Sequence, residues 1–168
     1  MKENTHRGFT LIELILYLAI SALLLLGVST FLVIILGSRT KGQVVTEVEQ
    51  QGWEVSQVIT QTIRNSLSVN YPVIGYSSSS LSLAVATTSS NPIIFDLKGG
   101  SLRITEGAGG PITLTNDRVG VTSLVFENLA RSGTKDLIRF KLTISYLNPA
   151  NKAEFNYSKN FYGSAQRR

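Results

Sequence analysis

The chain has 168 residues, no cysteine and a formal net charge of +5. This length accommodates one anchor helix and one small domain, whereas two soluble domains would not fit comfortably. Without cysteine the chain has neither a thiol nucleophile nor a cysteine-based zinc site, and an exported domain must be held together by packing alone, without disulfides.

The most informative element is a long apolar run near the amino terminus. From Leu14 to Leu36, 23 residues carry no charge, and a helix of that length is long enough to cross a hydrocarbon core about 30 Å thick. A cleaved secretory signal would have an apolar core of about 7–15 residues followed by a small-x-small site. Here the small residues Ala19, Ser21 and Ala22 lie inside the run, so we expect a membrane-spanning helix.

The residues before this run form a distinctive motif. A short polar leader ends at Gly8 and is followed by the sequence FTLIEL at residues 9–14 and then by the apolar helix. This combination of a glycine, an aromatic residue, a glutamate at a fixed offset and a membrane-length run resembles the amino-terminal segment of type IV pilins and of type II secretion pseudopilins. An ordinary signal anchor would explain the length and the preceding Lys2 and Arg7, but not this order of residues.

The resemblance implies that this chain is processed by another protein. In the family a membrane peptidase cuts after the glycine and methylates the new amino group, which here means cleavage between Gly8 and Phe9 and an N-methylated Phe9. The implied partners are the prepilin peptidase, other pilin or pseudopilin subunits, the inner-membrane assembly platform and, before assembly, membrane lipid. The implied location is the cytoplasmic (inner) membrane, crossed once with the carboxy-terminal domain outside the cytoplasm, and then an extracellular or periplasmic filament.

Glu13 lies at the edge of the apolar run, and we expect it to act in filament assembly. An acid near the bilayer centre costs about 2.5–3.5 kcal/mol on insertion scales, and less near the interface. When helices leave the lipid and pack together, an unpaired carboxylate becomes more costly, and the freed amino group of a neighbouring subunit's Phe9 can neutralise it. The alternative is that Glu13 simply lies at the membrane interface.

The distribution of basic residues determines neither the orientation of the helix in the membrane nor whether the protein binds nucleic acid. Lys2 and Arg7 precede the span while Arg39 and Lys41 follow it, so the positive charges on the two sides balance. Beyond the span the basic residues are scattered, apart from the last two arginines, and spacing alone does not show that they converge on one face. Nucleic acid therefore stays an alternative partner.

The helix is expected to continue past the membrane as an amphipathic segment. Apolar or small residues recur every three or four positions while polar residues occupy the other faces. A coiled-coil seam fits less well because the run is short and contains Gly52, so we expect the stripe to pack on the carboxy-terminal domain. Gly27, Gly37, Gly42 and Gly52 are expected weak points, each costing about 0.8–1 kcal/mol relative to alanine. The stripe comprises Val44, Val45, Val48, Gly52, Val55, Ile59, Ile63 and Leu67.

The rest of the chain alternates short β-prone runs with turn residues. The clearest element is a hairpin in which residues 98–101 (KGGS) connect the runs 93–97 and 102–105, with glycine supplying positive φ. Residues 136–146 alternate apolar and polar side chains, which predicts one core face and one solvent face. Further strands are expected from Leu81 to Val85, from Ile112 to Leu114, from Val119 to Phe126 and through Phe155, Tyr157 and Phe161, with a loop from Ser77 to Ser80.

Together these elements predict an α+β fold of the pilin type. A long amino-terminal helix, membrane-spanning in its first half and amphipathic in its second, is expected to pack on a carboxy-terminal antiparallel β-sheet. The expected organisation is a cytoplasmic leader at 1–8, a transmembrane or filament-core helix at 9–37, its amphipathic continuation at 38–68 and a β-rich globular domain at 69–168.

We expect no enzymatic activity, no cofactor and no metal site. The one histidine, His6, lies in the leader, and Asp96, Asp117 and Asp136 are far apart in sequence. The triplet 115–117 (TND) is more typical of a turn than of a calcium loop.

The expected function is that of a prepilin-like structural subunit. It would be processed after Gly8 and assembled through its amino-terminal helix into a type IV pilus-like filament. The lack of cysteine departs from the common pattern of major pilins and favours a minor pilin or a pseudopilin, and within the pilus function we favour a minor component. The alternatives are a type II secretion pseudopilin and a membrane-anchored binding module whose β domain recognises DNA, sugar or a surface.

Overall fold

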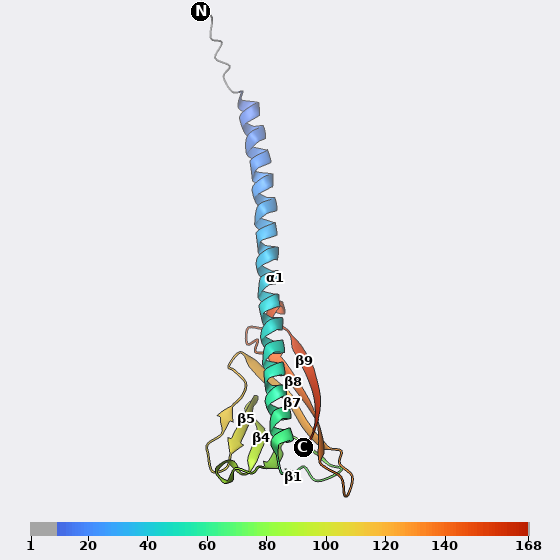
Figure 1. The fold of residues 1–168 in the computed structure, drawn as a ribbon. Coiled ribbons are helices and arrows are strands. Elements are labelled where there is room, and N and C mark those ends of the chain that lie inside the picture. Colours follow the sequence, from blue (N-terminus) through green and yellow to red (C-terminus); the bar gives the residue numbers. More distant parts are fainter. Residues whose placement is uncertain (1–9, 168) are drawn as a thin grey trace, which may run out of the picture. The chain divides into compact units, whose positions relative to one another are not determined.

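The computed structural model describes residues 10–167, whose elements are shown in Figure 1. A single helix, α1 (Leu11–Asn65), precedes all the strands of this part of the chain. The chain divides after Thr40 into two compact units, so that α1 contributes to both. The other elements are β1 (Ser68–Tyr71), β2 (Ser77–Ser78), β3 (Leu81–Ala84), η1 (Thr88–Ser90), β4 (Ile93–Lys98), β5 (Ser101–Glu106), β6 (Ile112–Thr113), β7 (Val119–Asn128), β8 (Leu137–Tyr146), η2 (Ala153–Phe155) and β9 (Ser158–Gln166).

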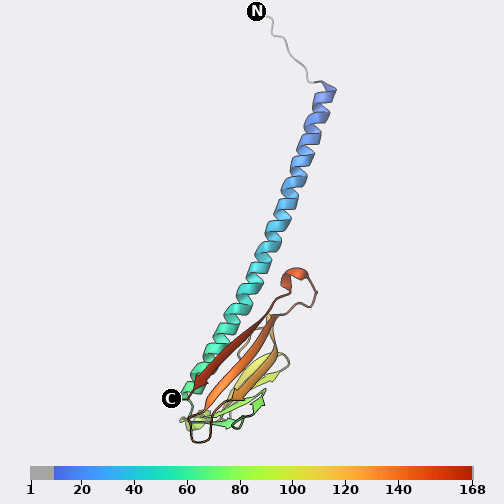
Figure 2. The same cartoon turned by 90° about the vertical axis from the view of Figure 1, so that its right-hand side faces the viewer.

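The strands form two antiparallel sheets, with orders β1-β3-β4-β5-β6 and β2-β7-β8-β9. The sheets meet where the Val121 N–H donates a hydrogen bond of 2.7 Å to the Gly100 carbonyl. The second half of α1 packs on this β domain, and Figure 2 shows β9 running beside it. The predicted α+β class, with a long helix packed on antiparallel strands, is confirmed, and the division into two sheets is an addition to that prediction.

The predicted hairpin is confirmed. Strands β4 and β5 pair in continuous register from Ile93 opposite Glu106 to Lys98 opposite Ser101. Gly99 and Gly100 form the turn with φ of 60° and 78°. Both values lie in the left-handed region that glycine adopts without steric cost, which is why a two-residue connection closes here.

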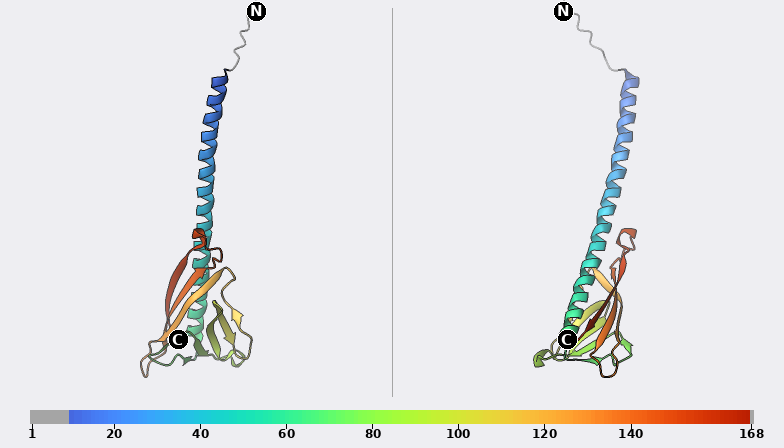
Figure 3. Two further views of the ribbon diagram at one scale, coloured as in Figure 1. Left: turned by 180° about the vertical axis from the view of Figure 1, so that it is seen from behind. Right: turned by 45° about the vertical axis from the view of Figure 1, so that its right-hand side comes forward.

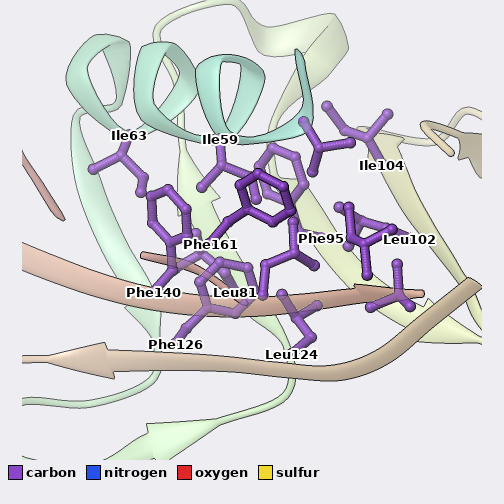
Figure 4. Packing of buried hydrophobic residues seen from close by; sticks show 14 of the residues in the cluster. Ile59, Ile63, Leu81, Phe95, Leu102, Ile104, Leu124, Phe126, Phe140 and Phe161 are labelled. Carbon is purple, nitrogen blue, oxygen red and sulfur yellow. The ribbon is translucent and has the colours of Figure 1, made fainter. Parts of the chain in front are cut away.

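The core lies between α1 and both sheets. The predicted stripe is confirmed from Val44 to Ile63, and Figure 4 shows Ile59 and Ile63 facing the rings of the core. Phe126 links the sheets, since its ring centroid lies 6.5 Å from those of Phe95 and Phe140. The alternation predicted for 136–146 is also confirmed, because Ile138, Phe140, Leu142 and Ile144 are buried.

Gly52 has a packing role that the prediction of a weak point missed. A Cβ atom built on Gly52 would lie 2.0 Å from the ring of Phe161 on β9. The missing side chain therefore forms a notch that brings the helix and the strand into close contact. Gly27, Gly37 and Gly42 have nothing within 4 Å of a built Cβ, so Gly52 differs from the other three in its surroundings.

Three details of the sequence prediction were wrong. Leu67, expected in the stripe, lies beyond α1 and is exposed, because the Ser66 hydroxyl bonds the Ile63 carbonyl at 2.7 Å where the helix ends. Ser77 and Ser78, expected in a loop, pair with β7 as β2. Phe155, expected in the last strand, lies in η2, where its ring stacks on Tyr146 at 5.7 Å.

Candidate functional site

The predicted processing site and assembly residue lie at the start of the chain. Gly8 and Phe9 fall outside residues 10–167, so their cleavage and methylation stay predictions. Glu13 is described, and it lies half-buried in the first turn of α1.

Thr10 caps the amino terminus of α1. Its carbonyl accepts hydrogen bonds from the N–H groups of Glu13 and Leu14 at 3.1 and 3.2 Å, and its Oγ1 lies 3.4 Å from the Glu13 nitrogen. Threonine followed three residues later by glutamate is the capping-box pattern, and a carboxylate in the first turn is favoured by the helix dipole. The Glu13 carboxylate therefore occupies a favourable position at the helix start, whatever its role between subunits.

The importance of Thr10 was missed in the sequence, although its signal was present. The pattern [ST]-x-x-[DE] before an apolar run is a recognisable helix start. The same residues also belong to the pilin-like motif, so one short segment carries both signals.

The first unit of the chain presents an apolar helix surface. Apart from the partly buried Ile35, the large apolar side chains between Leu11 and Leu36 are exposed, from 47% at Ile20 to 78% at Ile12. Within the described residues, α1 is the one helix long and apolar enough to cross a membrane. Water does not tolerate so large a contiguous apolar surface, so lipid or neighbouring helices must cover it.

Two of the hydroxyl groups within this apolar segment, those of Ser21 and Thr30, are hydrogen-bonded inside the helix. Ser21 donates to the Tyr17 carbonyl at 2.8 Å and Thr30 to the Leu26 carbonyl at 2.9 Å. An unpaired hydroxyl in hydrocarbon is costly, whereas one bonded to the preceding turn is not. These side chains are therefore compatible with an apolar environment on every side of the helix.

The second half of α1 is fixed to the β domain by polar contacts around Glu49. Its Oε1 accepts a hydrogen bond of 2.6 Å from Lys159 Nζ and one of 3.4 Å from the Tyr157 hydroxyl. The hydrogen bond from Lys159 lowers the pKa of Glu49 and, in return, raises the pKa of Lys159. Both side chains are more than one-third exposed, so the pair orients the helix more than it stabilises the fold.

A second contact fixes the loop before β7 to the same helix. The Asn116 amide donates a hydrogen bond to Glu47, and the Asn116 N–H donates to Gln51 Oε1 at 3.2 Å. Arg118 adds an ion pair with Glu47 at 3.7 Å. The segment 115–117 is therefore a docking turn on α1.

The aspartates considered as metal ligands do not converge. Asp96 pairs with Arg103 across the β4–β5 hairpin, which raises the pKa of the Arg103 guanidinium through their hydrogen bond. Asp136 pairs with Arg167 at 3.8 Å. Among residues 10–167, no group of three or more histidine, aspartate or glutamate side chains is placed to hold a metal ion.

Comparison with known proteins identifies the amino-terminal segment. Residues 4–29 match the family model of the prokaryotic N-terminal methylation motif. The chain therefore carries the amino-terminal methylation motif found in type IV pilins and pseudopilins, which confirms the resemblance seen in the sequence. No curated protein and no solved structure matches the chain.

Proposed function

We propose that the chain is a minor structural subunit of a type IV pilus-like filament, cleaved after Gly8, N-methylated at Phe9 and held in the filament by α1. The observation that carries the proposal is the exposed apolar surface from Leu11 to Leu36, which overlaps the methylation motif. A surface of this kind requires two successive environments in a filament subunit, namely lipid before assembly and the helices of neighbouring subunits afterwards.

In this proposal Glu13 sets the position of each subunit along the filament. A carboxylate leaving the membrane interface for a helix bundle needs a cation, since an unpaired charge in an apolar environment is costly. The amino group released at Phe9 of the adjacent subunit is that cation. Cleavage would thus create the partner of Glu13.

The proposed pathway places the leader in the cytoplasm and the β domain outside it. The prepilin peptidase would act on the leader, after which the assembly platform would move the subunit from the inner membrane into the filament. The chain has no catalytic role in this pathway. Its minor status is proposed because the sequence contains no cysteine, unlike the common pattern of major pilins.

Substitution at Glu13 tests this role, provided that capping and charge are separated. Glutamine also serves at the third helical position of a capping box, so Glu13→Gln retains the helix start and removes the charge. We expect Glu13→Gln subunits to be inserted and cleaved normally but strongly depleted from sheared filaments, measured by quantitative mass spectrometry.

Thr10→Ala is the matched control, because it removes the cap while leaving the Glu13 charge in place. We expect Thr10→Ala subunits to enter filaments near the wild-type level. Normal incorporation of Glu13→Gln would show that the charge has no role in assembly.

A type II secretion pseudopilin is the alternative function, since the methylation motif is common to both classes. The same mass spectrometry separates them. A minor pilus subunit is present in surface filaments at low copy number, whereas a pseudopilin is absent from them and its deletion blocks protein secretion.

A membrane-anchored binding module remains the alternative from another class. In that case the chain would stay in the membrane and the β domain would bind DNA, sugar or a surface. Salt-dependent DNA binding would favour it, because phosphate contacts weaken as salt rises.

A further inference from the structure

The turn between β1 and β2 exposes large apolar side chains. Tyr71, Val73, Ile74 and Tyr76 are between 47% and 67% exposed. They lie within six consecutive residues, so the exposed apolar side chains are concentrated in one short segment. Contiguous exposed apolar residues of this kind mark an interaction surface.

This turn is held in place by a buried side chain. Asn128, which is 1% exposed, donates from Nδ2 to the Pro72 carbonyl at 3.0 Å. Its backbone carbonyl accepts from the Gly75 N–H at 2.9 Å, and its own N–H donates to the Tyr76 carbonyl at 3.1 Å. The apolar side chains are therefore presented by a fixed backbone, which reduces the ordering cost of binding.

Two cations lie in the neighbouring loop. Residues 129–136 connect β7 and β8 directly after Asn128, and this loop and the apolar turn lie at the same end of the β domain (Figures 2 and 3). Leu129 adds a partly exposed apolar side chain. Arg131 and Lys135 are exposed and, among the described residues, have no ion-pair partner.

The acidic side chains beside these segments already form ion pairs with other residues. Glu127 pairs with Arg139 at 2.6 Å, and Asp136 pairs with Arg167 at 3.8 Å. The positive charge of Arg131 and Lys135 is thus not cancelled locally. We call the apolar turn with Leu129, Arg131 and Lys135 the domain tip.

We propose that the domain tip docks on an anionic phospholipid bilayer. Val73 and Ile74 enter the boundary of the hydrocarbon, Tyr71 and Tyr76 lie at headgroup depth, and the two cations contact lipid phosphates. Aliphatic, tyrosine and basic side chains together match the successive layers of a bilayer surface. This activity goes beyond filament assembly and does not depend on it.

The test uses the full chain with its own anchor already embedded. The protein is reconstituted into nanodiscs of neutral phosphatidylcholine, and binding to separate vesicles is measured by flotation. We expect binding to vesicles that contain phosphatidylserine and little binding to pure phosphatidylcholine vesicles. Each cation near a charged bilayer contributes about fivefold in affinity.

Two pairs of substitutions examine the two parts of the tip. We expect Arg131→Glu with Lys135→Glu to weaken binding at least tenfold, and Val73→Asp with Ile74→Asp to do the same. The control for the charge is Lys98→Glu with Lys152→Glu, and the control for the apolar side chains is Ile112→Asp. These side chains are also exposed but lie elsewhere in the β domain, so we expect the control variants to bind like the wild type.

Three results would overturn the proposal. The first is no binding to the anionic vesicles, and the second is equal loss of binding in the tip variants and their controls. The third is association between nanodiscs that the tip variants abolish, together with no tip-dependent binding to the anionic vesicles. The tip would then be an interface between copies of this chain.

Discussion

The two halves of α1 share one helix but differ in what surrounds them. From Leu11 to Leu36 nearly all the large apolar side chains are exposed, whereas between Val44 and Ile63 a single stripe is buried against the β domain. A one-sided apolar stripe is satisfied within its own chain, but an all-round apolar surface is not. The comparison shows that the first half is built for partners that the chain itself does not contain.

The largest expected effect comes from truncating the stripe. Ile59 is fully buried, so we expect Ile59→Ala to lower the free energy of unfolding by about 2–5 kcal/mol through lost burial and a cavity. The matched variant Ile34→Ala removes a side chain that is 61% exposed and should leave this free energy unchanged. Urea unfolding in detergent, followed by the fluorescence of Trp53, measures both. Equal effects would contradict the difference between the halves.

Substitutions at Gly52 and Gly42 compare a packed and an open position on the same helix. In Gly52→Ala the new methyl group meets the Phe161 ring, and we expect a loss of about 1–3 kcal/mol from overpacking. Gly42→Ala enters open space and should stabilise the helix by up to about 1 kcal/mol. The same unfolding measurement applies. A stabilising Gly52→Ala would show that the helix and β9 are not in close contact.

The smallest expected effect is that of the Glu49–Lys159 pair. The pKa of Glu49 is lowered from its ordinary value of 4.5, so its stabilising contribution is complete above that value and is lost as the pH falls through the lowered pKa. Glu49→Gln should therefore be slightly less stable than the wild type at neutral pH. The difference should shrink below pH 4.5, and a constant difference across this range would exclude the pair as its cause.

Much of the fold could be predicted because its signals are local. The spacing from Val44 to Ile63 identified the buried face of α1, and the two glycines after Lys98 identified a hairpin. Ser77 and Ser78 could not be recognised as a strand, since serines have no apolar alternation and their pairing depends on Phe126 and Glu127 far along the chain. The division into two sheets likewise depends on contacts between distant segments.

The candidate site was predicted from its motif rather than from its geometry. The glycine, the aromatic residue and Glu13 stand at fixed offsets, which a sequence displays directly. The cap formed by Thr10 is also a local signal, because threonine is followed three residues later by glutamate. The notch at Gly52 could not be predicted from the sequence. In a sequence, a glycine within a helix indicates only reduced helix stability, and its packing role depends on the Phe161 ring that fills the space.

The most direct measurement of the central claim is the intact mass and amino-terminal sequence of the chain co-expressed with an active prepilin peptidase. The account predicts a protein that has lost residues 1–8 and begins with Phe9 carrying one additional methyl group. A chain that still begins at Met1, in cells where a reference prepilin is fully processed, would contradict it.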